Sequence, residues 1–334
     1  PSLLQPFIGY LADRKNLRYL VILAPAISAT TMSLLGIAPG YAVLALLLMI
    51  TGLSSASLHA VGPVIAGRLS GNHLGRGMGF WMVGGELGRT LGPLVIVTAI
   101  EVLGLDRTPW LMAGGWLTSL LLYIRLKDVD GQPSAPAQAL PWRQAVRVMG
   151  PLLVPLVGII GVRAFMSAAL TTYLPVFLTS EGAELWLAGI ALSVLEAAGV
   201  AGALLGGSLS DRLGRRTILL ISMMVTPLLM FAFLAALVWL GPSGLALFPL
   251  LLLLGFSALS VTPVIMALVQ ESFPENRALA NGLYMALSFV LRSIVVVVLG
   301  AMSDQWGMRL AFGASAIIPL LGLPLLWRLP LPKR

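Results

Sequence analysis

The chain has 334 residues, of which 58% are hydrophobic and only 10% are charged, and its formal net charge is +8. A soluble domain carries about 25% charged residues, so the composition excludes a water-soluble globule and predicts an all-α protein that crosses a membrane many times. Its apolar runs are about 20 residues long, as membrane-spanning helices require, and they lack the alternation of a membrane β-barrel. The absence of cysteine excludes disulfides and cysteine-ligated metals.

The predicted helices are numbered from 2 to 12, because an internal repeat implies that a helix 1 precedes them. Residues 1–12 end helix 2, and helices 3 to 6 are expected at about 18–38, 41–67, 77–103 and 109–126. A polar segment with three prolines, residues 127–148, follows and predicts a linker between two bundles. Helices 7 to 12 are expected at about 150–179, 184–206, 217–240, 244–269, 278–302 and 308–328.

Ten residues near the start are echoed in the second half of the chain. Gly9–Arg18 reads GYLADRKNLR and Gly207–Arg216 reads GSLSDRLGRR, with Asp13 and Asp211 198 positions apart. This repeat predicts two six-helix bundles related by pseudo-twofold symmetry, an N-terminal bundle ending at residue 126 and a C-terminal bundle covering 149–334. By the same symmetry, helix 1 and most of helix 2, roughly 50 residues, are expected to precede this sequence.

The basic residues are unevenly distributed over the predicted loops. With the loop of Asp13 placed in the cytoplasm, the cytoplasmic side holds Arg14, Lys15, Arg18, Arg68, Arg76, Arg125, Lys127, Arg143, Arg147, Arg212, Arg215, Arg216, Arg277, Arg328, Lys333 and Arg334. The outer loops hold two, Arg107 and Arg309. Such an excess of Lys and Arg marks the cytoplasmic side of a membrane protein. We therefore expect a multi-pass protein of a prokaryotic cytoplasmic (inner) membrane, with the loops of Asp13 and Asp211 facing the cytoplasm.

Two six-helix halves joined by a linker, with Gly-x-x-x-Asp-Arg after helices 2 and 8, resemble the major facilitator superfamily. The resemblance implies a cytoplasmic latch between the halves made by Gly9, Asp13, Arg14, Gly207, Asp211, Arg212, Arg215 and Arg216. The first copy departs from the family pattern, because Asn16 replaces a glycine and Leu17 a basic residue. Since asparagine tolerates a left-handed turn, we expect the first copy to keep its shape but to hold less firmly.

Helix 5 carries a second resemblance. Gly79, Gly88, Gly92 and Pro93 have the spacing of a motif found in the superfamily's proton-coupled drug exporters, although Ile96 and Val97 stand where two glycines are usual. The segment from Gly52 to Pro93 is similar to the fosmidomycin-resistance branch.

Five charged residues fall at mid-membrane positions of the predicted helices: Glu86, Arg89, Arg163, Glu196 and Arg292. Charges in a membrane are costly and normally face a cavity or a partner. Glu86 and Arg89 are three residues apart and can pair on one helix face, either as a structural ion pair or as a proton carrier and its counter-ion. We expect Arg163, in the preceding helix, to be the partner of Glu196.

Arg292 mirrors Arg89 in the repeat but has no acid nearby on its own helix, which suits an anionic substrate group or an acid from the other bundle. His59 is either a packing histidine or a proton relay. We therefore name Glu86, Arg89, Glu196 and His59 as proton-coupling candidates. The candidates for a substrate cavity are Arg163, Arg292, Trp81, Tyr173 and Tyr284.

The sequence shows no phosphate-binding loop, metal-ligand cluster or nucleophile triad. We therefore expect no enzymatic activity, no cofactor and no nucleic-acid partner. The predicted function is proton-coupled export of a small drug-like or anionic compound by a monomer in the lipid bilayer, working by alternating access. Proton-linked uptake of a small metabolite is the alternative, and a receptor or assembly factor without transport is a third possibility.

Overall fold

The structure, a computed structural model, describes residues 1–129, 139–242, 244 and 247–330. Within these residues all regular secondary structure is helical. The middle of the predicted linker, 130–138, lies outside the described residues, as do Lys333 and Arg334 of the predicted cytoplasmic tail.

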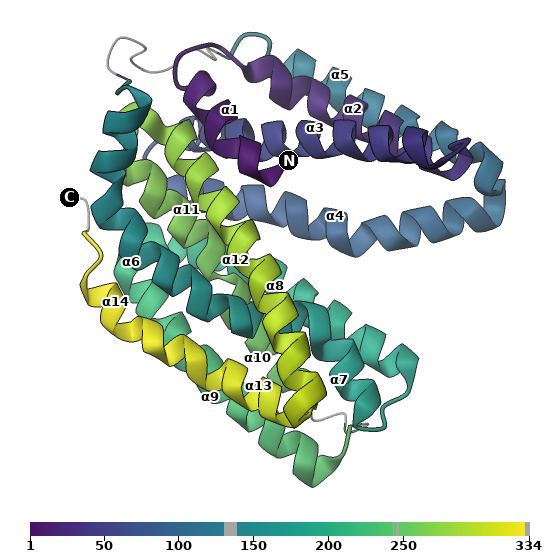
Figure 1. Cartoon of the computed structure of the whole chain (residues 1–334), viewed down its shortest axis with the longest axis vertical. Helices are drawn as coiled ribbons and strands as arrows, with labels where there is room; N and C mark the ends of the chain where they lie inside the picture. Colours follow the sequence, from purple (N-terminus) through teal and green to yellow (C-terminus); the bar gives the residue numbers. More distant parts are fainter. Residues whose placement is uncertain (130–138, 243, 245–246, 331–334) are drawn as a thin grey trace. The chain divides into compact units, whose positions relative to one another are not determined.

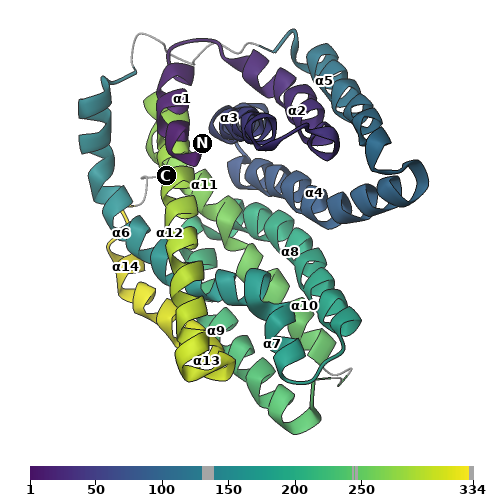
Figure 2. The same cartoon turned by 45° about the vertical axis from the view of Figure 1, so that its right-hand side comes forward.

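The first half of the chain forms five α-helices. They are α1 (Gln5–Ala12), α2 (Arg18–Ser33), α3 (Tyr41–Leu69), α4 (Leu74–Leu103) and α5 (Met112–Leu126). Helix α2 packs against both α3 and α5, as Figures 1 and 2 show. These helices correspond to the predicted helices 2 to 6, since α1 is the predicted end of helix 2.

The second half contains nine α-helices among the described residues. They are α6 (Trp142–Ala168), α7 (Leu174–Ser180), α8 (Leu185–Leu213), α9 (Arg215–Leu240), α10 (Leu247–Leu259), α11 (Val261–Ser272), α12 (Arg277–Trp306), α13 (Met308–Ile317) and α14 (Leu323–Trp327). A π-helical turn, Ala169–Tyr173, connects α6 to α7. Three of the predicted helices are therefore each built from two consecutive segments.

Two helix boundaries differ from the sequence-based expectation. Helix α6 begins at Trp142 rather than near residue 150, so the end of the predicted linker is helical. Pro141 stands directly before this helix, a position where its missing N–H costs nothing. Helix α8 continues past the expected end near residue 206 and stops at Gly214, whose φ of 93° favours glycine. Asp211 therefore lies in a helix rather than in a loop.

The first copy of the repeat has a different local shape. Helix α1 ends at Ala12, and Asp13 and Arg14 form a turn. The expectation that the first copy keeps the shape of the glycine turn is wrong, because Asn16 does not adopt the left-handed conformation: positive φ among the described residues occurs only at glycines. The Asn16 side chain instead accepts a hydrogen bond from the Arg18 N–H, at 3.2 Å, where α2 begins. A local side-chain bond thus replaces the glycine turn.

The chain contacts divide the protein into two compact units. The first comprises Pro1–Leu69, Leu91–Val148 and Val269–Ala286, and the second comprises Ser70–Thr90, Met149–Leu268 and Leu287–Arg334. The core of the first unit gathers α1, α2, α3 and the start of α12 around residues such as Ala60 and Val64. The core of the second gathers α6 to α10, α12 and α13 around Phe177, Phe233 and Phe312. The predicted division into bundles at residues 126 and 149 remains a prediction.

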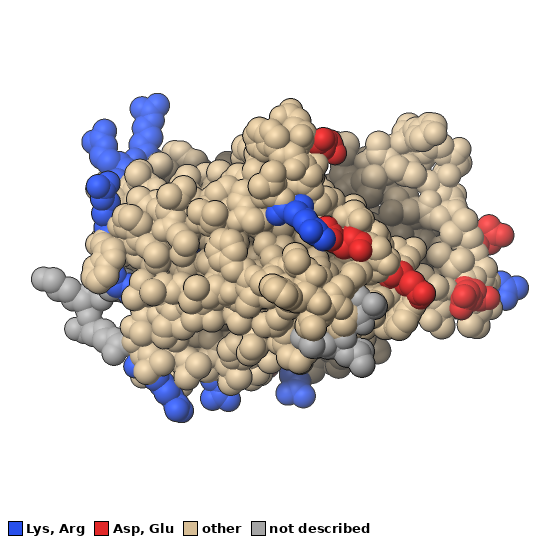
Figure 3. All heavy atoms as spheres, turned by 90° about the horizontal axis from the view of Figure 1, so that it is seen from below, with Lys and Arg blue, Asp and Glu red and all other residues tan. Residues whose placement is uncertain are grey.

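The surface has the character of a membrane protein. Eight described helical segments are long and apolar enough to cross a membrane. On the face drawn in Figure 3, uncharged residues cover most of the surface, and charged side chains occupy only a few places. Many large apolar side chains are exposed along α3, α5 and α9, as expected where lipid replaces water as the solvent.

Candidate functional site

Glu86 and Arg89 form an ion pair on α4, as the spacing predicts. The Glu86 side chain is only 2% exposed, whereas that of Arg89 is 46% exposed. The carbonyl oxygen of Glu86 also accepts a hydrogen bond from the Thr90 hydroxyl, at 3.0 Å. A carboxylate is thus buried beside one arginine that can still reach outward.

Glu196 and Arg292 belong to the same compact unit and extend this group. Charge interactions join Glu196, on α8, to Arg89, Glu86 and Arg292, and Arg292, on α12, to the same two residues of α4. The two acids and two arginines therefore form one electrostatic group, the charge cluster, which is Glu86, Arg89, Glu196 and Arg292. Of the two alternatives left open for Arg292, the structure places acids from α4 and α8 near it.

Arg163 is not among the charged residues that act on Glu196, although the sequence analysis expected the two to pair. Its guanidinium donates to the carbonyl oxygen of Ala258, on α10, at 2.9 Å. The expectation failed because adjacency in the chain was used as a guide to adjacency in space, whereas the charges acting on Glu196 come from α4 and α12.

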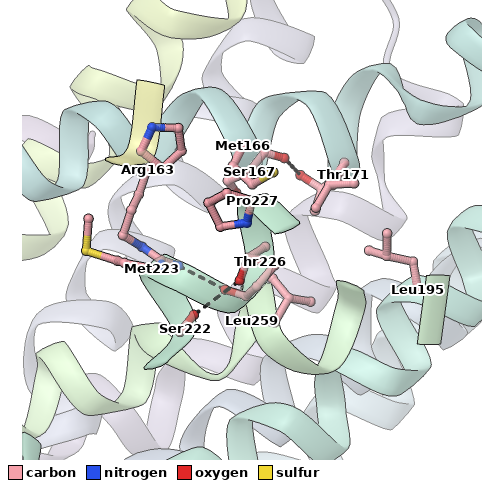
Figure 4. Close-up of a pocket in the computed structure, with 13 residues that line it drawn as sticks. Arg163, Met166, Ser167, Thr171, Leu195, Ser222, Met223, Thr226, Pro227 and Leu259 are labelled. Carbon is pink, nitrogen blue, oxygen red and sulfur yellow. Dashed lines mark hydrogen bonds between the residues drawn. The ribbon is translucent and has the colours of Figure 1, made fainter. Parts of the chain in front are cut away.

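Arg163 lines a small cavity inside the second unit (Figure 4). The cavity measures about 20 Å³ for the centre of a water-sized sphere, enough for one water molecule. Its polar lining comes from hydroxyl groups at helical i, i+4 spacing, Ser167 with Thr171 and Ser222 with Thr226. Sequence reasoning missed these hydroxyl residues, although that spacing within apolar helices was a usable signal.

The aromatic candidates do not line this cavity. The Tyr173 hydroxyl donates to the carbonyl oxygen of Val296, on α12, at 2.8 Å. Tyr284 is buried and Trp81 is half-buried. The structure thus gives Tyr173 a defined contact with α12, and a role of the three in substrate binding remains a prediction.

His59 lies in the first compact unit, on α3. Its Nδ1 is 3.0 Å from the Ser55 carbonyl oxygen, and its own carbonyl accepts a hydrogen bond from the Asn281 side chain at 2.9 Å. These contacts are what a packing histidine would make, and both alternatives for His59 remain open.

Asp13 holds the start of α12. Its two carboxylate oxygens accept hydrogen bonds from the backbone N–H groups of Ala278 and Leu279, at 2.9 and 2.8 Å. These N–H groups have no partner within their own helix, and the helix dipole favours a negative charge there. Gly9 permits the approach, since a Cβ atom at this position would overlap the Ala278 backbone. Burial raises the pKa of Asp13 to about 6, against the lowering effect of the two N–H groups and of Arg68 and Arg14.

Asp211 holds the start of α4 in the same way within the second unit. Its carboxylate accepts from the N–H groups of Gly75 and Arg76, at 2.8 and 2.9 Å. Arg215 adds an ion pair to Asp211 at 2.7 Å, with both side chains 8% exposed. Gly207 allows close backbone contact with Gly75. The sequence predicted Asp211 as a latch residue but not its helix-terminal partners.

The arginines of the two copies have different neighbours. Arg14 turns toward the end of the linker and donates to the carbonyl oxygens of Leu140 and Ala139, at 2.6 and 3.2 Å. Arg216 stacks over the Trp327 ring at 4.5 Å, while Arg212 is exposed. In both copies the aspartate thus binds N–H groups at the start of a helix, whereas the arginines have different neighbours.

The glycine motif of helix 5 is only partly explained by packing. At Gly79 a Cβ atom would lie 2.9 Å from the Ala203 carbonyl oxygen, so glycine lets α4 approach α8 closely. Among the described residues, nothing lies within 4 Å of a Cβ atom built at Gly88 or Gly92. The side chain of Pro93 lies outside the described part of the chain.

Comparison with known proteins decides the family. The sequence profile of the Major Facilitator Superfamily matches residues 1–258 and 222–334. The chain belongs to the Major Facilitator Superfamily. It is therefore a secondary transporter with an all-helical, multi-pass membrane fold, as the sequence predicted, and it is not an enzyme.

Two curated relatives carry resistance names. The Fosmidomycin resistance protein of Escherichia coli (strain K12) is 26% identical over 336 residues, covering 96% of this chain and 79% of that protein. The Multidrug resistance protein MdtG of Citrobacter koseri is 26% identical over 235 residues, covering 69% of this chain and 58% of that protein. These similarities support the predicted branch of the superfamily.

Solved structures show the same fold. The human organic anion transporter MFSD10 (TETRAN) superposes with a TM-score of 0.74 at 20% identity, over 97% of this chain and 80% of that one. The proton:xylose symporter XylE superposes with a TM-score of 0.69 at 15% identity, over 99% and 85% of the two chains. At these identities the likeness concerns the fold alone.

Proposed function

We propose that this transporter exports a small drug-like or anionic compound in exchange for protons, by alternating access across a prokaryotic cytoplasmic membrane. The observation that carries the proposal is the charge cluster, in which a buried Glu86 and a second acid, Glu196, share two arginines. The names of the two resistance proteins support export, and the excess of basic residues around Asp13 and Asp211 supports a cytoplasmic position for those segments.

The cluster has the chemistry that proton coupling needs. Removing a carboxyl group from water favours its protonated form, whereas a nearby arginine favours its ionised form. Arg89 is close enough to pair with Glu86 and exposed enough to leave it. A conformational change that separates this pair would let Glu86 bind a proton, and one that rejoins it would make Glu86 release the proton. Proton flow would in this way be coupled to movement of the transporter.

The two aspartates suit a change between two states. Each binds backbone N–H groups at the start of a helix from the other half of the chain, and each contact is made of a few directional hydrogen bonds. Such contacts can break and reform as units. We propose that they stabilise one of the two alternating states.

Transport in proteoliposomes tests the direction. The protein is reconstituted, fosmidomycin serves as the first probe because a relative is named for it, and a proton gradient of either sign is imposed. Accumulation of the probe against the proton flux supports exchange. Accumulation together with the proton flux overturns export and establishes uptake, and movement independent of both gradients overturns proton coupling.

Glu86→Gln tests the role of the cluster. The substitution keeps the side-chain size but removes the titratable group, so we expect proton-driven transport to fall at least 100-fold, while counterflow of substrate without a gradient persists. Glu181→Gln is the matched control, because it breaks the ion pair with Arg309 outside the cluster. Full proton-driven transport by Glu86→Gln would assign this pair a structural role.

A further inference from the structure

The π-helical turn between α6 and α7 is attached to α12 by two side chains. Tyr173 donates to the Val296 carbonyl at 2.8 Å, and the Thr171 hydroxyl accepts a hydrogen bond from Arg292 Nη2 at 3.0 Å. Gly300 leaves room for the tyrosine, since a Cβ atom there would lie 2.7 Å from the Tyr173 hydroxyl oxygen. Because 292, 296 and 300 are four residues apart, they form one face of α12. Isolated π-helical turns often occur at functional sites.

Arg292 also belongs to the charge cluster. The charges of Glu196, Glu86 and Arg89 all act on it, yet it donates its hydrogen bond to the neutral Thr171 hydroxyl. Glu86, meanwhile, is paired with Arg89. One guanidinium thus bonds a neutral acceptor while the charge of the Glu196 carboxyl group also acts on it.

We propose that Arg292 exchanges between the Thr171 hydroxyl and the Glu196 carboxylate, so that proton binding at Glu196 decides whether α12 stays attached to the π-helical turn. The inference rests on the proposed proton coupling and makes Arg292 a positioning residue. A protonated Glu196 is neutral and attracts Arg292 only weakly, which leaves the Thr171 bond intact. An ionised Glu196 offers the stronger, charge-assisted hydrogen bond.

The charged groups that act on Glu196 lie on two other helices. They are Glu86 and Arg89 on α4, and Arg292 on α12. Of the helices packed against α8, α7 and α10 contain no charged residue, and α9 has charges only at its first two positions, Arg215 and Arg216.

Loss of the Thr171 bond would loosen the π-helical turn. The hydroxyl would keep its bond to the Ser167 carbonyl, at 2.8 Å, and Tyr173 would remain as the link to α12. Thr171 also lines the cavity of Arg163 (Figure 4), so a shift of the turn would change that cavity. Proton loss at Glu196 would in this way alter the segment where α6 continues into α7.

A spin label next to the turn tests the exchange without any substrate. The chain has no cysteine, so Val176→Cys, at an exposed position on α7, provides one labelling site. The full chain in proteoliposomes is studied by electron paramagnetic resonance from pH 5 to 9. We expect a pH-dependent change in label mobility, which Glu196→Gln abolishes by fixing the acid-pH spectrum at every pH.

Thr171→Val removes the acceptor at nearly constant volume. It should move the pH midpoint of the change in label mobility by about one unit toward acid, because Arg292 then has no competing acceptor and stabilises the ionised form of Glu196 more strongly. Thr171→Ser, which keeps the hydroxyl, should leave the midpoint unchanged. Circular dichroism and gel filtration check that each variant folds. Should Thr171→Val not fold, Arg292→Lys serves instead, because lysine lacks the fork that pairs with a carboxylate and should move the midpoint toward alkaline pH.

If the mobility of the label does not depend on pH, or if the variants leave the pH midpoint unchanged, the proposed exchange of Arg292 between Thr171 and Glu196 is overturned. Proton coupling itself is judged separately by the gradient-driven transport of the unlabelled protein. Transport that follows the gradient together with an unchanged midpoint would therefore reject the role of Arg292 and keep the proposed function.

Discussion

The buried carboxylates of this protein are satisfied in two different ways. Glu86 is paired with an arginine on its own helix, whereas Asp13 and Asp211 accept hydrogen bonds from the backbone at the start of another helix. A buried carboxylate without such partners would cost several kcal/mol. The difference matters at the residue scale, because a side-chain partner can move away, while helix N–H groups are fixed in place.

The raised pKa of Asp13 predicts that its contact with the start of α12 depends on pH. Its pKa of about 6 in the folded protein, against an ordinary value of 3.8, means that the buried form binds protons more tightly than an exposed one. The resulting stabilisation is complete below pH 3.8 and is lost as the pH rises through about 6. Lowering the pH from 7 to 5 should therefore favour the contact with α12 about tenfold, or by ~1.3 kcal/mol.

Hydrogen exchange of the Ala278 and Leu279 amides, followed by mass spectrometry, measures this response. Asp13→Asn is the control, because it cannot titrate and corrects for the effect of pH on chemical exchange. Equal pH dependence in both proteins would contradict the prediction.

At the scale of elements, glycine determines how closely α8 and α10 pack. A Cβ atom at Gly255, on α10, would overlap the Leu195 carbonyl group of α8, and one at Gly202, on α8, would overlap the Phe256 backbone of α10. In membranes, small residues allow helix backbones to approach and gain van der Waals contact. The contact depends on these positions in both helices.

Gly255→Leu should separate the two helices. Because the neighbouring atoms are backbone and cannot move aside cheaply, we expect a loss of about 3 kcal/mol or more and a lower thermal unfolding midpoint. The midpoint can be followed by the fluorescence of the chain's eight tryptophans in detergent. Gly189→Ala is the matched control, since nothing lies within 4 Å of its Cβ position among the described residues. A similar midpoint for both variants would contradict the packing argument.

At the scale of the whole molecule, each compact unit combines segments from both halves of the repeat. The first unit contains Val269–Ala286 with the first half, and the second contains Ser70–Thr90 with the second half. These exchanged segments carry the helix starts that Asp13 and Asp211 bind. The repeat therefore places two related contacts in two different units.

The two contacts should differ in strength. Asp211→Asn leaves Arg215, itself 8% exposed, without its carboxylate, and breaking such a buried pair typically costs 3–5 kcal/mol. Asp13→Asn should cost less, about 1 kcal/mol, because burial already disfavours the charge that is removed. Thermal unfolding midpoints of the two variants at pH 7 give the comparison. A larger loss for Asp13→Asn would refute it.

The sequence by itself determined the membrane fold, the positions of most helices, the Glu86–Arg89 pair and the two aspartates, because these follow from hydrophobic length, helical spacing and internal repetition. The extended ends of α6 and α8 and the conformation of Asn16 depended on local hydrogen bonds that composition does not reveal. Only the tertiary structure decided that the charges of Arg89 and Arg292, rather than that of Arg163, act on Glu196, and that the aspartates bind helix starts. Those contacts join residues far apart in the chain, and the rotation of each helix about its axis, which sets them, is fixed by packing.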